Sequence, residues 1–117
     1  MLRVSVLAFA FVALSLPAAA AGDTCLQPMP STLKIDGATA TVDQIKAASD
    51  EFTVYQNQSN EYLQCLTKYE ASLGKKITSE QKSSITAKYN AAVDDQKATA
   101  DALNKQIEAY CKGHPCE

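Results

Sequence analysis

The chain has 117 residues, a formal net charge of −2, one histidine and four cysteines. This length allows one domain at most, and the only arginine, Arg3, lies at the very start of the chain. Nucleic-acid and phosphate-binding proteins rely on arginine and on a basic surface, so we expect no nucleic-acid partner. A single histidine leaves little for acid–base catalysis near neutral pH, and we expect no enzymatic activity and no catalytic residue.

Residues 1–21 have the pattern of a secretory signal peptide. A basic start is followed by an apolar run over residues 4–16 and by an alanine-rich end. Ala19 and Ala21 occupy the small-residue positions that a signal peptidase reads, so we expect cleavage after Ala21. The apolar run is too short to span a bilayer comfortably. The mature protein is therefore expected to be periplasmic or secreted, with no membrane span after cleavage and a net charge of −3 from ten lysines and thirteen acidic residues.

Residues 22–41 show no helical or strand periodicity and are predicted to form an extended N-terminal arm. The arm contains Cys25 and two prolines, and proline favours extended backbone. Asp36 followed by Gly37 indicates a turn before the first helix.

The rest of the chain, residues 42–117, has the apolar periodicity of two helices that pack lengthwise. Apolar or small residues recur in steps of three and four in the first stretch: Ile45, Ala48, Phe52, Tyr55, Ser59, Tyr62, Leu66, Tyr69 and Leu73. The second stretch has a similar stripe: Ile85, Tyr89, Val93, Gln96, Ala100, Leu103, Ile107 and Tyr110. The predicted fold is all-α, a long coiled-coil-like antiparallel two-helix hairpin with helices over about 42–73 and 78–112 and a disulfide-stapled arm.

Both predicted helices begin with a capping box. Thr41 precedes Gln44 by three residues, and Thr78 precedes Gln81 in the same way. Gly74 can take the left-handed conformation that ends many helices, and a glycine and a proline follow the second helix.

A turn centred near residue 76 sets the register of the hairpin. It predicts four layers in which residues of the two helices meet: Phe52 with Ala100, Ala48 with Leu103, Ser59 with Val93, and Leu66 with Ile85 or Thr86. A large residue faces a smaller one in several of these layers, as interdigitating helices require.

Four cysteines in a small exported chain most often form two disulfides. In the hairpin register, Cys65 lies about 36 Å along the helix from the level of Cys111, whereas a disulfide needs Cα atoms within about 7 Å. Cys65 therefore reaches neither Cys111 nor Cys116, which leaves Cys25–Cys65 and Cys111–Cys116 as the complete pairing. An arm stapled in this way is expected to bury Leu26, Met29 or Leu33. If Cys65 is unpaired, Cys25 can instead bond Cys111 or Cys116.

A metal-binding or thiol-redox module is the alternative use of these residues. Zinc or copper could be bound by the sulfur and nitrogen donors of Cys111, His114 and Cys116, with Cys25 as a fourth ligand. Their spacing matches no standard ligand pattern, and exported thiols are usually oxidised. We therefore expect structural disulfides with no metal and no cofactor, and His114 as a cap on the helix end.

Four segments together resemble a group of small exported bacterial proteins of uncharacterised function: Cys25 followed by two prolines, Asp36–Thr41, Tyr62–Leu66 and Tyr89–Val93. The resemblance covers most of the mature chain, but its motifs are structural. Members of the group commonly have the early cysteine and the one in the Tyr-Leu-x-Cys segment, which agrees with a Cys25–Cys65 bond. Cys111 and Cys116 depart from that pattern. The resemblance implies location and build, and no activity.

The expected function is binding or scaffolding in the bacterial envelope, or chaperone-like activity, without chemistry. The partner is expected to be another protein or a second copy of the chain, because two helices alone bury only one stripe each. Val54 and Leu63 lie off the main stripe of the first helix and are candidates for that contact.

Overall fold

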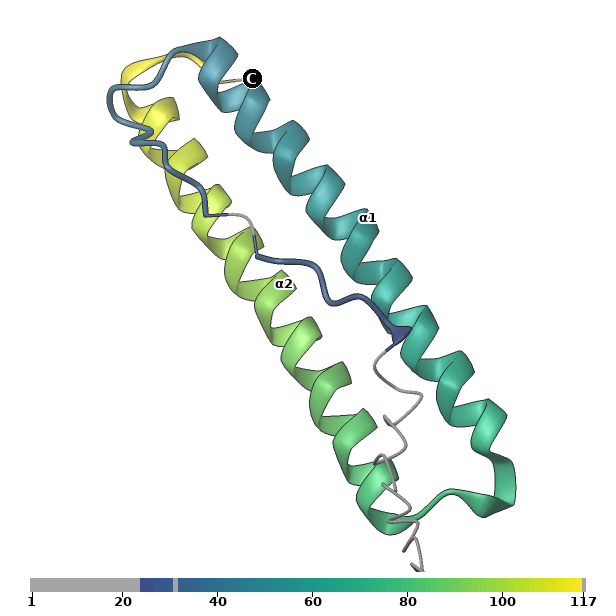
Figure 1. The fold of residues 1–117 in the computed structure, drawn as a ribbon. Helices are drawn as coiled ribbons and strands as arrows, with labels where there is room; N and C mark the ends of the chain where they lie inside the picture. Colours follow the sequence, from purple (N-terminus) through teal and green to yellow (C-terminus); the bar gives the residue numbers. More distant parts are fainter. Residues whose placement is uncertain (1–23, 31, 117) are drawn as a thin grey trace, which may run out of the picture.

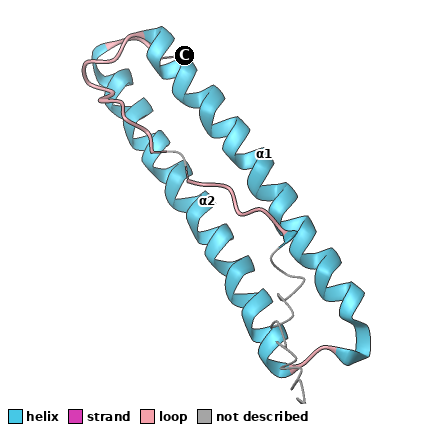
Figure 2. Ribbon diagram, in the orientation of Figure 1, coloured by secondary structure: helices cyan, strands magenta, loops and turns pink. Residues whose placement is uncertain are grey.

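The computed structural model describes residues 24–30 and 32–116. Its elements are α1 (Val42–Leu73), a short 3-10 turn η2 (Gly74–Lys76) and α2 (Ser79–Gly113). The two helices lie side by side and antiparallel, and the arm crosses the hairpin on one face before it reaches the middle of α1 (Figure 1). The described part contains only helices and loops (Figure 2). The predicted all-α hairpin with a stapled arm is confirmed.

Residues 1–21, the expected signal peptide, lie outside the described part of the chain. Neither α1 nor α2 contains a stretch apolar enough to cross a membrane, and this holds for all the residues that the structure describes.

Both capping boxes are present. The Gln44 N–H donates to Thr41 Oγ1 at 3.2 Å, and the Thr41 N–H donates to Gln44 Oε1 at 2.9 Å. Thr78 and Gln81 make the same two bonds at 3.1 and 2.9 Å. Because Thr78 is the cap and not the first helical residue, α2 begins one residue later than predicted.

The helix ends differ slightly from the prediction. Gly74 has a positive φ of 53°, as expected, but its ψ of −134° lies outside the left-handed helical region. α2 continues through Gly113, one residue beyond the predicted end. At that end, Nδ1 of His114 lies 3.1 Å from the Tyr110 carbonyl oxygen, one of the carbonyls that a helix terminus leaves free.

The core follows the contact between α1 and α2. The buried residues of α1 all belong to the predicted stripe: Ala48, Tyr55, Ser59, Tyr62 and Leu66. In α2 the buried residues are Ile85, Ala92, Thr99 and Leu103. The stripe predicted for α2 is therefore wrong in its middle, where Tyr89 and Val93 are 40% and 41% exposed.

Side-chain size explains this difference. Ala92 shares a core cluster with Tyr62, and the Thr99 side chain is a hydrogen-bonding neighbour of Tyr55. Small residues of α2 thus face large tyrosines of α1. Tyr89 lies about 40° around the helix axis from the buried Ile85 and about 60° from the buried Ala92, and this rotation turns it toward the flank of the hairpin.

Contacts across the hairpin follow the predicted register closely. Leu66 and Ile85 lie in one core cluster, as predicted. The Gln96 side-chain amide donates to Asn60 Oδ1 at 3.0 Å and reaches the Gln56 carbonyl at 3.5 Å. Ser59 is 1% exposed, whereas Val93, which was predicted to face it, is 41% exposed and contributes little to the core.

The arm is fastened to α2 by a turn at Asp36. Asp36 accepts three backbone N–H groups: Ala38 at its carboxylate at 3.0 Å, and Thr39 and Ala40 at its carbonyl at 3.1 and 2.9 Å. The turn presses Gly37 against the backbone of Gln106, where any added Cβ would clash. Glycine is required here because of this close approach.

The arm buries less of its own apolar surface than expected. Leu26 and Met29 are 86% and 87% exposed, so the prediction that either is buried is wrong. Leu33 is half-buried. The disulfide explains this, because it turns Cys25 inward to 9% exposure in a core cluster with Tyr62 and thereby turns the adjacent Leu26 outward.

Candidate functional site

All four cysteines are bonded in pairs. Cys25 is joined to Cys65 with a Cα–Cα distance of 5.7 Å, and Cys111 is joined to Cys116 with a Cα–Cα distance of 5.3 Å. No free thiol is present in the part of the chain that the structure describes. Each pair satisfies the distance that a disulfide needs.

The structure does not bring the four residues of the metal or redox hypothesis together. Cys25 is bonded to the middle of α1, whereas Cys111, His114 and Cys116 lie at the C-terminal end of α2. The His114 ring stacks on the Tyr110 ring with centroids 4.2 Å apart and planes 6° apart. Among residues 24–30 and 32–116, no three histidine, cysteine or acidic side chains are placed to hold a metal ion.

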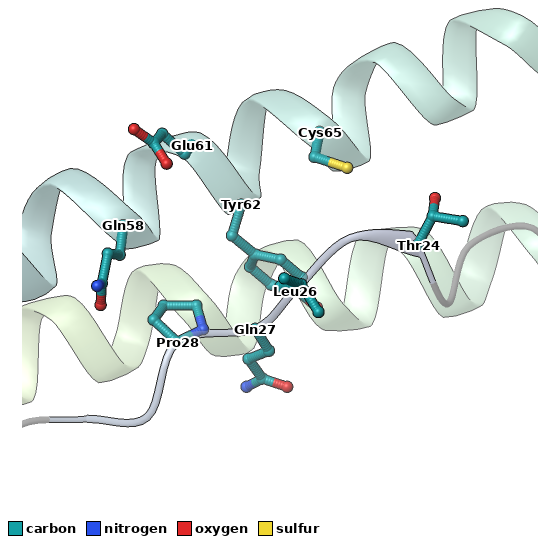
Figure 3. Close-up of a pocket in the computed structure, with 8 residues that line it drawn as sticks. All are labelled: Thr24, Leu26, Gln27, Pro28, Gln58, Glu61, Tyr62 and Cys65. Atoms are coloured by element: carbon teal, nitrogen blue, oxygen red, sulfur yellow. The ribbon is translucent and has the colours of Figure 1, made fainter.

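A hollow of about 500 Å³ lies between the arm and α1, next to the Cys25–Cys65 bond (Figure 3). Its lining combines arm and helix residues: Thr24, Leu26, Gln27, Pro28, Gln58, Glu61, Tyr62 and Cys65. Tyr62 points from α1 toward the arm, while Glu61 points away from it (Figure 3). The hollow is open to solvent along one side.

A second hollow of about 640 Å³ continues along α1 on the other side of the disulfide. It is lined by Thr24, Glu61, Gln64, Cys65, Lys68, Tyr69, Ser72 and Leu73. Thr24, Glu61 and Cys65 line both hollows, so the two form one groove interrupted by the disulfide. We call this surface the staple groove.

The staple groove has an apolar floor and polar edges. Tyr62 is 4% exposed, and this burial raises the pKa of its phenol above the ordinary value. Leu26, Pro28 and Leu73 add apolar surface. The glutamines, Glu61 and Lys68 at the edges supply hydrogen-bond donors and acceptors. This combination suits recognition of a polypeptide segment, with apolar side chains in contact with the floor and backbone groups bonded at the edges.

The groove was not predicted from the sequence, although Cys25, Cys65 and Tyr62 were. Tyr62 was expected in the core, and Leu26 was among the arm residues expected to be buried. A local feature of the sequence could have indicated the groove: Leu26 directly follows a cysteine and precedes a proline by two residues. A disulfide and a proline both restrict the backbone, so they can fix the position of Leu26 even when its side chain is exposed.

The two residues proposed for a partner contact differ in their surroundings. Val54 is 55% exposed, whereas Leu63 is partly buried against the cluster that contains Cys25, Tyr62 and Leu66. They therefore do not form one apolar patch off the stripe.

Comparison of the chain with protein-family models, with curated proteins and with solved structures finds no match in any of the three.

Proposed function

We propose that this chain is an exported, non-enzymatic protein of the bacterial envelope that binds apolar segments of other proteins in the staple groove, as a scaffold or chaperone-like module. One observation carries the proposal: Leu26 and Met29 are 86% and 87% exposed on an arm that a disulfide fixes beside this groove. Folding does not use these side chains, so their position favours a role in binding.

The compartment is part of the proposal. Two disulfides in a chain of this size are consistent with an extracellular or otherwise oxidising environment, where such bonds persist. The pattern of residues 1–21 supports export to the periplasm or the medium.

The groove suits an extended apolar segment. Pro28 and the disulfide restrict the arm before any partner arrives, so binding orders few additional residues. The side chain of Met29 is long and adaptable, and residues of this kind accept apolar partners of different shapes. We therefore expect broad specificity for apolar sequence with moderate affinity.

Suppression of aggregation tests the proposal. The mature chain is mixed with heat-unfolding citrate synthase, and light scattering is followed over time. We expect scattering to fall at equimolar ratio and the effect to be lost in the double variant L26S/M29S. The matched control is Val42→Ser, because Val42 is 51% exposed at the opposite end of α1. An inactive wild type, or an equal loss of suppression in V42S, contradicts the proposal.

A further inference from the structure

The hairpin has a second face that the arm leaves uncovered. At the centre of this face, the Gln96 side-chain amide of α2 bridges the helices. It donates to Asn60 Oδ1 and to the Gln56 carbonyl of α1. The arm is bonded to α1 at Cys65, and five residues turn a helix by about 140°. The arm and this amide cluster therefore lie on nearly opposite sides of α1.

Positions on this face follow one another in steps of three or four along both helices. They are Ile45, Ser49, Phe52, Gln56, Asn60, Leu63 and Thr67 in α1, and Thr86, Tyr89, Val93, Gln96, Ala100, Asn104 and Ile107 in α2. None of these described side chains carries a charge, whereas 21% of all residues in the chain are charged. The next positions on the same rows toward the turn, Glu70 and Lys82, are charged and mark the end of the face. We call this surface the uncharged face.

Charges of both signs lie at the edge of the uncharged face. On α2 they are Asp94, Lys97, Asp101 and Lys105, next to its apolar and amide residues. A centre depleted of charge inside a charged rim is the usual composition of a protein–protein interface. Phe52 and Leu63 are only half-buried here, and Tyr89 and Val93 are 40% and 41% exposed.

We infer that the uncharged face binds a second copy of this chain, so that two hairpins pack into a four-helix bundle. The uncharged face runs from Ile45 to Thr67 in α1, which is about 35 Å along the helix, and two adjacent helices are about 20 Å wide. The face thus offers about 700 Å² per chain, and stable interfaces of standard size bury about 600 to 1,000 Å² per partner. Stripes with three-and-four spacing are the pattern by which helices of such bundles interdigitate.

Two features favour a second copy over a different protein. Copies of an acidic chain repel each other, so they associate best through a surface without charges. The central residues of the face are amides, and an amide carries both donors and acceptors. Gln96 and Asn60 can therefore bond their own counterparts across a two-fold axis, as a self-complementary interface requires.

The dimer goes beyond the proposed binding function and does not depend on it. The uncharged face and the staple groove lie on opposite sides of the hairpin, so pairing leaves both grooves open on the outside of the bundle. A dimer then presents two grooves to its partners, which raises avidity for a client with two apolar segments.

Sedimentation equilibrium of the mature chain, from about 1 to 100 μM, tests the inference. We expect the mass of two chains, and we expect Val93→Glu to weaken association at least tenfold because it buries a charge at the interface. Val54→Glu is the matched control, since Val54 is exposed on the arm side of α1. A monomeric wild type, a larger assembly, or equal weakening by V54E would overturn the inference.

Two further measurements keep the test independent of folding defects. Gln96→Glu keeps the shape of the side chain but places like charges near the two-fold axis, and we expect it to weaken association while the circular dichroism spectrum stays helical. The dissociation constant of the wild type should not rise between 0.05 and 0.5 M NaCl, because no ion pairs join the copies and salt only screens their net repulsion. Strong weakening by salt, or an unaffected dimer in Q96E, would contradict the inference.

Discussion

Gly37 of the arm lies directly against the backbone of Gln106 in α2, and its N–H donates to Oε1 of the same residue at 2.8 Å. These two residues are 69 positions apart in the chain. Together with the Cys25–Cys65 bond, this contact fixes the arm at both of its ends, first to α2 and then to α1.

Gly37→Ala should destabilise the protein by about 1–3 kcal/mol, because the new methyl group meets backbone that cannot move without displacing α2. Thermal unfolding followed by circular dichroism at 222 nm measures the effect. Gly113→Ala is the control, since a Cβ at Gly113 meets nothing within 4 Å and alanine favours the helical conformation. We expect G113A to unfold at the same or a slightly higher temperature. A G37A variant as stable as the wild type would mean that the turn is not held against Gln106.

The two disulfides should differ in their effect on stability. Cys25–Cys65 joins residues 40 apart in sequence, and Cys111–Cys116 joins residues 5 apart. By lowering the entropy of the unfolded chain, the first bond should add up to about 4 kcal/mol to the free energy of unfolding, and the second about 2 kcal/mol. Urea unfolding of C25A/C65A and of C111A/C116A measures both losses. A larger loss from the second pair would contradict the role of the arm as part of the folded core.

Ser59→Ala should leave stability unchanged or raise it by about 1 kcal/mol. Ser59 Oγ is buried and has no hydrogen-bond partner among the described residues. Thr99→Val is the matched control, since the Thr99 hydroxyl donates to the Asp95 carbonyl at 2.8 Å. We expect T99V to lose about 1 kcal/mol in urea unfolding. Clear destabilisation by S59A would reveal a bond that the structure lacks.

Stability should fall at alkaline pH because of Tyr55 and Tyr62. Burial raises the pKa of both phenols above the ordinary value, and the Asp95 carboxylate adds to the rise at Tyr55 while hydrogen bonding to Thr99 opposes it. From about pH 10 upward, the unfolded chain loses these protons before the folded chain does, so stability decreases as pH rises toward the folded pKa values. Urea midpoints measured between about pH 8 and 11 should decline less in Tyr62→Phe than in the wild type.

Tyr110→Phe is the control for this pH dependence, because Tyr110 is only half-buried and lies outside the uncharged face. We expect the pH profile of Y110F to follow that of the wild type. If Y62F and Y110F change the profile equally, burial of Tyr62 is not the cause of the alkaline loss.

Helix positions were predictable from sequence because the signals are local. The capping boxes at Thr41 and Thr78 each involve residues three apart, and both formed as predicted. The buried stripe of α1 was equally clear, since apolar or small residues repeat in it in steps of three and four without interruption. The hairpin followed from the short connection between the two helices.

Two features depended on partners far away in the chain, and sequence reasoning missed them. The stripe of α2 was misplaced at Tyr89 and Val93, because apolar character alone does not reveal that Ala92 and Thr99 must fit against tyrosines of α1. The staple groove arises where the arm meets α1, and neither segment contains it alone. Asp36 and Gly37 were recognised as a turn, but their contact with Gln106 leaves no local trace.

The most direct test is non-reducing peptide mapping of the chain recovered from bacterial cells. It tests whether the protein is an exported hairpin with a stapled arm. We expect a first residue near Gly22, with Cys25 linked to Cys65 and Cys111 linked to Cys116 in the same chain. An uncleaved chain with free thiols, or a Cys65–Cys111 link within one chain, would contradict it.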